Sequence, residues 1–129
     1  MKAVRSDGAA AALGPYSQAV RTGQFLFVSG QIPLDPSTGQ IVSDDIREQA
    51  HRVLRSLGAI LETAGGSFEH VVRTTVFLTD LGDFAAMNEV YASYFGDPAP
   101  ARSTVQVAAL PKSVRLEIDA IAVLPEGPA

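Results

Sequence analysis

The chain has 129 residues, of which 47% are hydrophobic and 19% are charged, and its formal net charge is −4. These values predict one folded domain over residues 1–129, and they exclude a disordered chain and a basic surface for sequence-independent binding of nucleic acid. The absence of cysteine excludes disulfide bonds, a thiolate nucleophile and cysteine-ligated metals.

Membrane insertion and secretion are also disfavoured by the sequence. No segment approaches the ~20 apolar residues that a membrane-spanning helix needs. The N-terminal segment lacks the sustained apolar region of a secretory signal. We therefore expect a cytoplasmic protein without a membrane partner.

The N-terminal residues 1–13 have no clear periodicity and predict a lead-in strand or arm. Gly14-Pro15 then indicates a turn before a short extended segment that contains Tyr16. Two interpretations of Tyr16 stay open at this point. The ring either closes an edge of the core while half-buried, or its hydroxyl lines a site.

Thr22-Gly23-Gln24 predicts a hairpin turn into a strand over residues 25–30. Both alternating sets of side chains in this strand begin apolar, so we expect it to be buried on both faces. Ser29 and Gly30 end the strand and offer a hydroxyl and an approachable backbone. A glycine at this position is also suited to a β-bulge.

The strongest helix signal follows a loop over residues 31–40. Asp45 and Glu48 form a capping-box-like pair, and apolar residues recur at helical spacing until Gly65-Gly66 ends the pattern. The apolar stripe consists of Ile46, Ala50, Val53, Leu54, Leu57, Leu61 and Ala64. His51 and His70 have no carboxylate partners at ligand spacing, so no metal site is predicted.

A further strand is predicted over residues 70–79, and a second helix over residues 83–95. Gly96-Asp97-Pro98 ends this helix. Asn88 lies one position off its apolar stripe. Such an amide is either solvated or faces an enclosed site.

The C-terminal stretch predicts two strands, residues 103–110 and 114–123, joined by a turn at Pro111-Lys112-Ser113. Glu117 lies on the face opposite to the strand's apolar set, because side chains alternate along a strand. Arg102 stands where the first strand begins. We interpret Arg102 and Glu117 as the fixed charges of a site on adjacent strands. The alternative is a structural cross-strand ion pair, worth about 0.2–1 kcal/mol.

The order of these elements predicts an α+β domain of two layers, in which two helices cover one face of a mixed β-sheet. Each helix has a single apolar stripe, so neither can cover the apolar residues on the other face of the sheet. In a small soluble chain, that face needs another copy of the same chain. We therefore expect a closed homo-oligomer with its sheets facing inward and a site between subunits.

Several motifs, taken together and in order along the chain, resemble one known family. They are Gly14-Pro15-Tyr16-Ser17-Gln18-Ala19, Val28-Ser29-Gly30-Gln31-Ile32-Pro33, Thr74-Thr75-Val76-Phe77-Leu78, Met87-Asn88-Glu89-Val90-Tyr91, Pro100-Ala101-Arg102-Ser103, Leu110-Pro111-Lys112 and Leu116-Glu117-Ile118-Asp119-Ala120-Ile121-Ala122. This is the Rid family, also called the YjgF family, and the likeness is closest to its RidA-type enamine/imine deaminases. The resemblance implies a chorismate-mutase-like fold, a homotrimer and three sites at the subunit interfaces.

The resemblance also implies a function and a set of site residues. The implied reaction is the hydrolysis of reactive enamines and imines, such as 2-aminoacrylate, to a 2-keto acid and ammonia. Arg102 is implied to hold the substrate carboxylate, and Glu117 to position the attacking water. The implied pocket residues are Tyr16, Ser29, Gly30, Asn88 and Thr104. Thr104 stands where the deaminases commonly carry a cysteine, which removes any thiol-based function.

The residue types suit this chemistry without a cofactor or metal. A guanidinium matches a carboxylate with two parallel hydrogen bonds, and a carboxylate can accept the proton of water that attacks an activated imine. A second hypothesis is a non-catalytic protein that binds small carboxylates, or a regulatory protein of the same fold. Such a protein would use Arg102 but would not depend on Glu117. An RNA-directed activity fits poorly with the net charge, so no nucleic-acid partner is expected.

Overall fold

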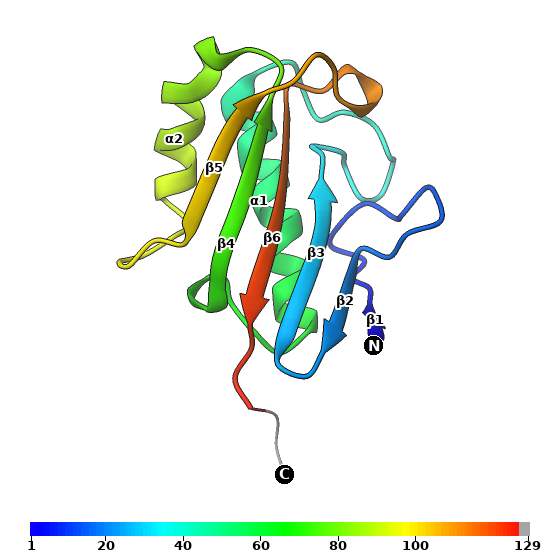
Figure 1. The fold of residues 1–129 in the computed structure, drawn as a ribbon. Helices are drawn as coiled ribbons and strands as arrows, with labels where there is room; N and C mark the ends of the chain where they lie inside the picture. Colours follow the sequence, from blue (N-terminus) through cyan, green and yellow to red (C-terminus); the bar gives the residue numbers. More distant parts are fainter. Residues whose placement is uncertain (127–129) are drawn as a thin grey trace.

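The computed structural model describes residues 1–126. It contains a six-stranded sheet in the order β1-β2-β3-β6-β4-β5, with both helices on one face (Figure 1). The strands are β1 (Lys2–Val4), β2 (Ala19–Thr22), β3 (Phe25–Gln31), β4 (Val71–Leu78), β5 (Ala101–Gln106) and β6 (Leu116–Val123), and the helices are α1 (Ile46–Thr63) and α2 (Phe84–Ala92). The predicted α+β architecture with a mixed sheet is confirmed. None of the helices in this part of the chain is both long and apolar enough to span a membrane.

The central strand β6 pairs antiparallel with β3 on one side and with β4 on the other, and β5 pairs parallel with β4. The expectation that the last two strands are adjacent is therefore wrong, because β4 lies between them. The predicted strand over residues 103–110 is also displaced, since β5 ends at Gln106. The chain from Val107 to Arg115 is long enough to cross the end of β4, whereas a tight turn would have forced β5 and β6 to pair directly.

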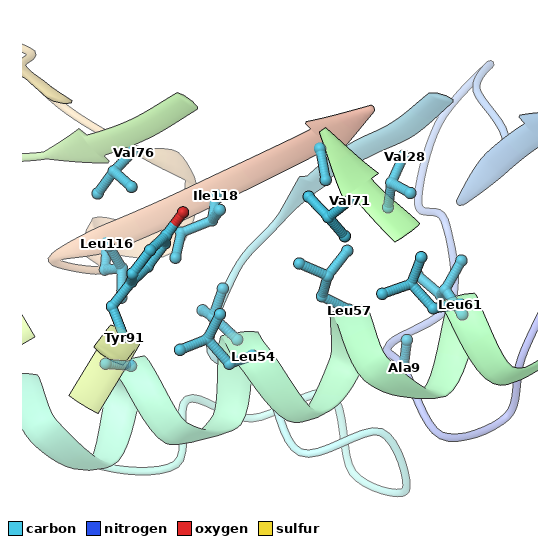
Figure 2. Packing of buried hydrophobic residues seen from close by; sticks show 14 of the residues in the cluster. Ala9, Val28, Leu54, Leu57, Leu61, Val71, Val76, Tyr91, Leu116 and Ile118 are labelled. Carbon is cyan, nitrogen blue, oxygen red and sulfur yellow. The ribbon is translucent and has the colours of Figure 1, made fainter. Parts of the chain in front are cut away.

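Helix α1 forms where the apolar stripe predicts it. The Asp45 carboxylate accepts a hydrogen bond from the backbone N–H of Glu48 at 3.0 Å, which satisfies one of the free donors of the first turn. The stripe packs under the sheet, with Leu54, Leu57 and Leu61 facing the strands (Figure 2). Gly65 follows with a φ of 88°, a left-handed conformation that ends the helix at little steric cost.

Helix α2 is shorter than the predicted range of residues 83–95. The backbone N–H groups of Ser93 and Tyr94 bond to the carbonyls three residues earlier, and the Ser93 hydroxyl donates to the Val90 carbonyl at 2.6 Å. This serine side chain competes for the helix carbonyl and tightens the last turn. The α-helix therefore ends at Ala92.

The face of the sheet opposite the helices is open in a single chain, and we call it the open face. On β3, Leu26 and Val28 are buried under the helices, but Phe25 is 49% and Phe27 42% exposed. The prediction that this strand is buried on both faces is thus wrong for one chain alone. Phe25 and Phe27 pair with Val123 and Ile121 of β6, so the open face carries a contiguous apolar area.

A buried polar side chain joins α1 to the start of β6. Gln49 is 1% exposed, and its amide oxygen accepts a hydrogen bond from the Arg115 backbone N–H at 2.9 Å. Its amide nitrogen donates to the Ser43 carbonyl at 2.8 Å. The Arg115 guanidinium in turn donates to both carboxylate oxygens of Asp83 at 3.0 Å. These contacts fix Arg115, which directly precedes β6, the strand that contains Glu117.

We predict that Gln49→Leu lowers the free energy of unfolding by about 1–2 kcal/mol, because it leaves the part-buried Arg115 N–H and Ser43 carbonyl without these partners. Urea denaturation followed by circular dichroism measures this change. Gln40→Leu, at an exposed position, serves as the control and should shift the value by less than about 0.5 kcal/mol. An unchanged unfolding free energy in Gln49→Leu would show that this link contributes nothing.

Candidate functional site

Glu117 lies on the open face, as the alternation along β6 predicts, while Leu116 and Ile118 point into the core. Gly30 of β3 lies in the stretch where the register with β6 shifts, between the Val28–Ala120 and Gln31–Ile118 pairs. A Cβ atom at position 30 would lie 2.7 Å from the carboxyl carbon of Glu117. Both interpretations of this glycine therefore apply, because the irregular strand pairing and the missing side chain together make room for the carboxylate.

Burial raises the pKa of Glu117, and the nearby negative charge of Asp119 adds to this effect. Glu117 forms no ion pair with any residue of the described chain. Asp119 is instead held in place, since its carboxylate accepts a hydrogen bond from the Thr75 backbone N–H at 3.1 Å. An unpaired carboxylate with a raised pKa is a stronger proton acceptor than an ordinary glutamate.

Glu117 shares a pocket of about 450 Å³ with three other predicted site residues, Tyr16, Ser29 and Gly30. Tyr16 is 55% exposed, so it does not close an edge of the core, and its hydroxyl lies 3.4 Å from the backbone N–H of Leu13. The Ser29 hydroxyl donates to the Ser17 carbonyl at 2.6 Å, which fixes the Tyr16 loop against β3. The remaining lining residues are Leu13, Ile32, Pro111 and Lys112.

Lys112 is a pocket residue that sequence reasoning missed. It sits in the short 3₁₀ turn Pro111–Ser113 with a φ of 56°, next to Ser113 with a φ of 59°. Two successive non-glycine residues in the left-handed region are not predictable from residue type. The available signal was the Pro-Lys-Ser turn itself, which places a cation directly before the strand that carries Glu117.

Arg102 lies on the other side of the sheet. It pairs in register with Thr74 of β4, which is fully buried on the helix-covered face. Its guanidinium carbon lies 4.8 Å from the ring centre of Tyr91 and 5.6 Å from that of Phe84, both on α2. Arg102 makes no ion pair within residues 1–126. The expected pair of charges on adjacent strands is therefore wrong, and so is the alternative of a structural ion pair between them.

Two more predicted residues accompany Arg102. Asn88 lies one helical turn from both Phe84 and Tyr91, so it shares their side of α2. Its amide oxygen is buried without a hydrogen-bond partner in the described part of the chain, which does not fit a solvated amide. Thr104 pairs in register with the buried Val76, which places it on the same face of β5 as Arg102. These three residues form a second group at the β5 edge of the sheet.

The two histidines have structural partners. His51 Nδ1 lies 2.9 Å from the Tyr94 hydroxyl, and His70 Nδ1 accepts a hydrogen bond from the Ser67 backbone N–H at 2.9 Å. In the chain up to residue 126, no cluster of three histidine or acidic side chains is arranged to hold a metal ion. The site residues are thus divided into a carboxylate group around Glu117 and a guanidinium group around Arg102.

The chain is similar in sequence and in fold to several known proteins. A sequence model of the family described as Endoribonuclease L-PSP matches residues 7–124. Protein DfrA of Myxococcus xanthus is 58% identical over 124 residues, which cover 95% of each chain. The 2-iminobutanoate/2-iminopropanoate deaminase of Mus musculus is 50% identical over 127 residues, which cover 98% of this chain and 93% of the relative.

Among solved structures, RidA from the Antarctic bacterium Psychrobacter sp. matches with a TM-score of 0.93 and 44% sequence identity. The match covers 96% of this chain and 100% of that chain. Sequence and fold therefore agree over nearly the full length. They confirm the resemblance seen in the sequence motifs: the chain belongs to the Rid family, also called the YjgF family.

Proposed function

We propose that this protein is an enamine/imine deaminase that hydrolyses 2-imino acids, of the kind formed from 2-aminoacrylate, to 2-keto acids and ammonia. The names of its relatives support the reaction class, since the mouse relative is a 2-iminobutanoate/2-iminopropanoate deaminase. The observation that carries the proposal is Glu117, an unpaired carboxylate with a raised pKa in a pocket with Tyr16 and Ser29. This is the group that the reaction needs to accept a proton from water.

The complete site requires two copies of the chain. Arg102 lies on the helix-covered face at the β5 edge, and Glu117 lies on the open face. A neighbouring copy that sets its β5 edge against the open face would bring one Arg102 to the other chain's Glu117. Such a head-to-tail contact closes into a ring when the rotation between successive copies adds up to a full turn. We propose a homotrimer with the sheets facing inward, in which each interface holds one site and the exposed Phe25 and Phe27 are covered.

In this site the planar guanidinium of Arg102 holds the substrate carboxylate through two hydrogen bonds and so fixes the adjacent imine carbon. Water attacks that carbon of the protonated imine as one of the water protons passes to Glu117. Glu117 then returns the proton to the nitrogen. The C–N bond breaks with its electron pair leaving on ammonia, and the hydroxyl proton is released as the carbonyl forms.

The other site residues shape the pocket. Gly30 leaves room for the Glu117 carboxylate, and the Ser29 hydroxyl, held by Ser17, keeps the Tyr16 loop in place. The buried amide oxygen of Asn88 offers an unused acceptor on the Arg102 side. Thr104 gives that side a hydroxyl in place of a thiol.

RNA cleavage, which the description of the family model names, is the less favoured function for this chain. The formal net charge is −4, and RNA-binding surfaces are built on clustered basic residues that neutralise phosphates. The proposed catalytic group is itself a carboxylate, which repels a phosphate. A small substrate with one carboxylate, held by one guanidinium, fits the described charges better.

The first prediction from this proposal concerns assembly. Sedimentation equilibrium of the wild type should give three times the chain mass, and Phe27→Asp should give a monomer, because it places a charge in the covered apolar area. Val42→Asp is the matched control, since Val42 is exposed beside α1. A wild-type monomer, or a trimer that survives Phe27→Asp, would contradict the proposed arrangement.

The second prediction concerns Arg102. Arg102→Ala should lower kcat/KM for 2-imino acids by at least about 100-fold, because two charge-assisted hydrogen bonds to the carboxylate are lost. Arg102→Lys should recover little of this, since an ammonium lacks the planar fork. Ammonia release from enzymatically generated 2-aminoacrylate measures the rate. Arg47→Ala, at an exposed pair with Glu89, is the control, and wild-type rates in Arg102→Ala would place carboxylate binding elsewhere.

The third prediction separates catalysis from binding alone. Glu117→Gln should lower kcat by about 100-fold, the lower end of what a general base contributes, while the affinity for pyruvate changes little because Arg102 holds that carboxylate. The wild-type rate should also fall as the pH drops through the raised pKa of Glu117, and this fall should be absent in Glu117→Gln. Unchanged turnover in a well-folded trimer would favour the non-catalytic carboxylate binder.

The stability of Glu117→Gln provides the control for this experiment. A folded-state pKa above the ordinary value of 4.5 means that protonation favours the fold. The protonated carboxyl therefore contributes to the free energy of unfolding below pH 4.5, and this stabilisation is lost as the pH rises through the raised pKa of Glu117. At pH 7 the neutral amide removes the cost of the buried charge, so the variant should be at least as stable as the wild type. A large loss of stability would instead assign Glu117 a structural role.

A further inference from the structure

The guanidinium of Arg102 is held by an aromatic ring and by no carboxylate of the described chain. Tyr91 is 6% exposed, and its ring extends from α2 toward the sheet (Figure 2). The guanidinium carbon of Arg102 lies 4.8 Å from the centre of this ring, and the Phe84 ring lies farther away, at 5.6 Å. At these distances the positive charge is attracted to the ring faces.

The ring of Tyr91 is itself fixed. Its hydroxyl forms a 2.7 Å hydrogen bond with the hydroxyl of Thr74, which is fully buried. Thr74 is the residue that pairs in register with Arg102 on the neighbouring strand. Phe95 packs against the ring, with the two ring centres 4.5 Å apart. The ring is thus tied to the same point of the sheet from which Arg102 extends.

We propose that Tyr91 is a positioning residue that orders the Arg102 guanidinium for the substrate carboxylate, an inference that rests on the proposed deaminase function. A ring contact occupies the flat face of a guanidinium and leaves the N–H groups at its edge free to bind a carboxylate. An ion pair with a protein carboxylate would use those same donors. The aromatic contact therefore restricts a long, flexible side chain without blocking its function.

The charge state of Tyr91 is consistent with this role. Burial raises the pKa of its hydroxyl, although the hydrogen bond with Thr74, the charge of Arg102 and a smaller hydrogen-bonding effect of the same guanidinium act in the opposite direction. The phenol therefore stays neutral at neutral pH, so Tyr91 presents a π-face and does not pair with Arg102 as a phenolate. The contact with Arg102 then persists over the pH range in which Glu117 titrates.

The test is a set of variants assayed for KM, kcat and pyruvate affinity. Tyr91→Met fills space without a π-face, and it should raise KM for 2-imino acids and the Kd for pyruvate by about 10-fold, with kcat within about threefold of the wild type. Tyr91→Phe keeps the ring and should restore both values to within about threefold. Phe68 belongs to the same aromatic cluster, where it packs against Tyr94 and Phe95, but the rings beside Arg102 are those of Tyr91 and Phe84. Phe68→Met should therefore leave KM and Kd unchanged.

Nuclear magnetic resonance provides a readout that does not depend on activity or on the Tyr91 variants folding. In the wild type, the Nε–H proton signal of Arg102, assigned by its loss in Arg102→Lys, should be shifted by aromatic ring currents relative to that of the exposed Arg47. The shift should largely persist in Phe84→Leu, which leaves Tyr91 as the contacting ring. A signal at the solvated position would overturn the proposal, as would an unchanged KM in folded Tyr91→Met. A wild type that binds pyruvate but does not hydrolyse imines would refute the deaminase function alone, since the pyruvate and resonance measurements would still test Tyr91.

Discussion

The alternation of side chains along β6, β4 and β5 is the constraint on which the rest of the structure depends. In β6 it sends the apolar residues to the core and Glu117 to the open face. Because β5 pairs in register with β4, the same rule sends Arg102 to the helix-covered face with Thr74. Shifting either pairing by one residue would exchange the two faces. Strand register therefore determines which surface carries the carboxylate and which carries the guanidinium.

This arrangement explains why one chain has two incomplete groups of polar residues. The Glu117 pocket offers a proton acceptor but no nearby guanidinium, and the Arg102 group offers a carboxylate-binding fork but no base. In the proposed assembly, each group supplies what the other lacks. The exposed Phe25 and Phe27 supply the apolar area that a stable contact between copies needs. In the proposed trimer, assembly and the formation of the site are one event.

The sequence predicted those features that depend on local patterns. The stripe and caps of α1, the inward set of β6 and the position of Glu117 follow from periodicity and residue type alone. The position of Arg102 required knowledge that β4 separates β5 from β6, and strand order is set by contacts between residues distant in the chain. Periodicity cannot reveal it. Lys112 was missed for another reason, because it lines the pocket from a turn with a left-handed backbone, and such strain depends on tertiary structure.

The edge position of β5 has a consequence for how the protein would behave in a cell. A strand paired on one side only depends on its surroundings for cover, and in the proposed trimer that cover is the neighbouring copy. Catalysis would then depend on protein concentration, because dilution below the dissociation constant of the assembly would separate the two halves of every site while each chain kept its fold. Expression level would act as a switch, and a fully folded but solitary chain would be inactive.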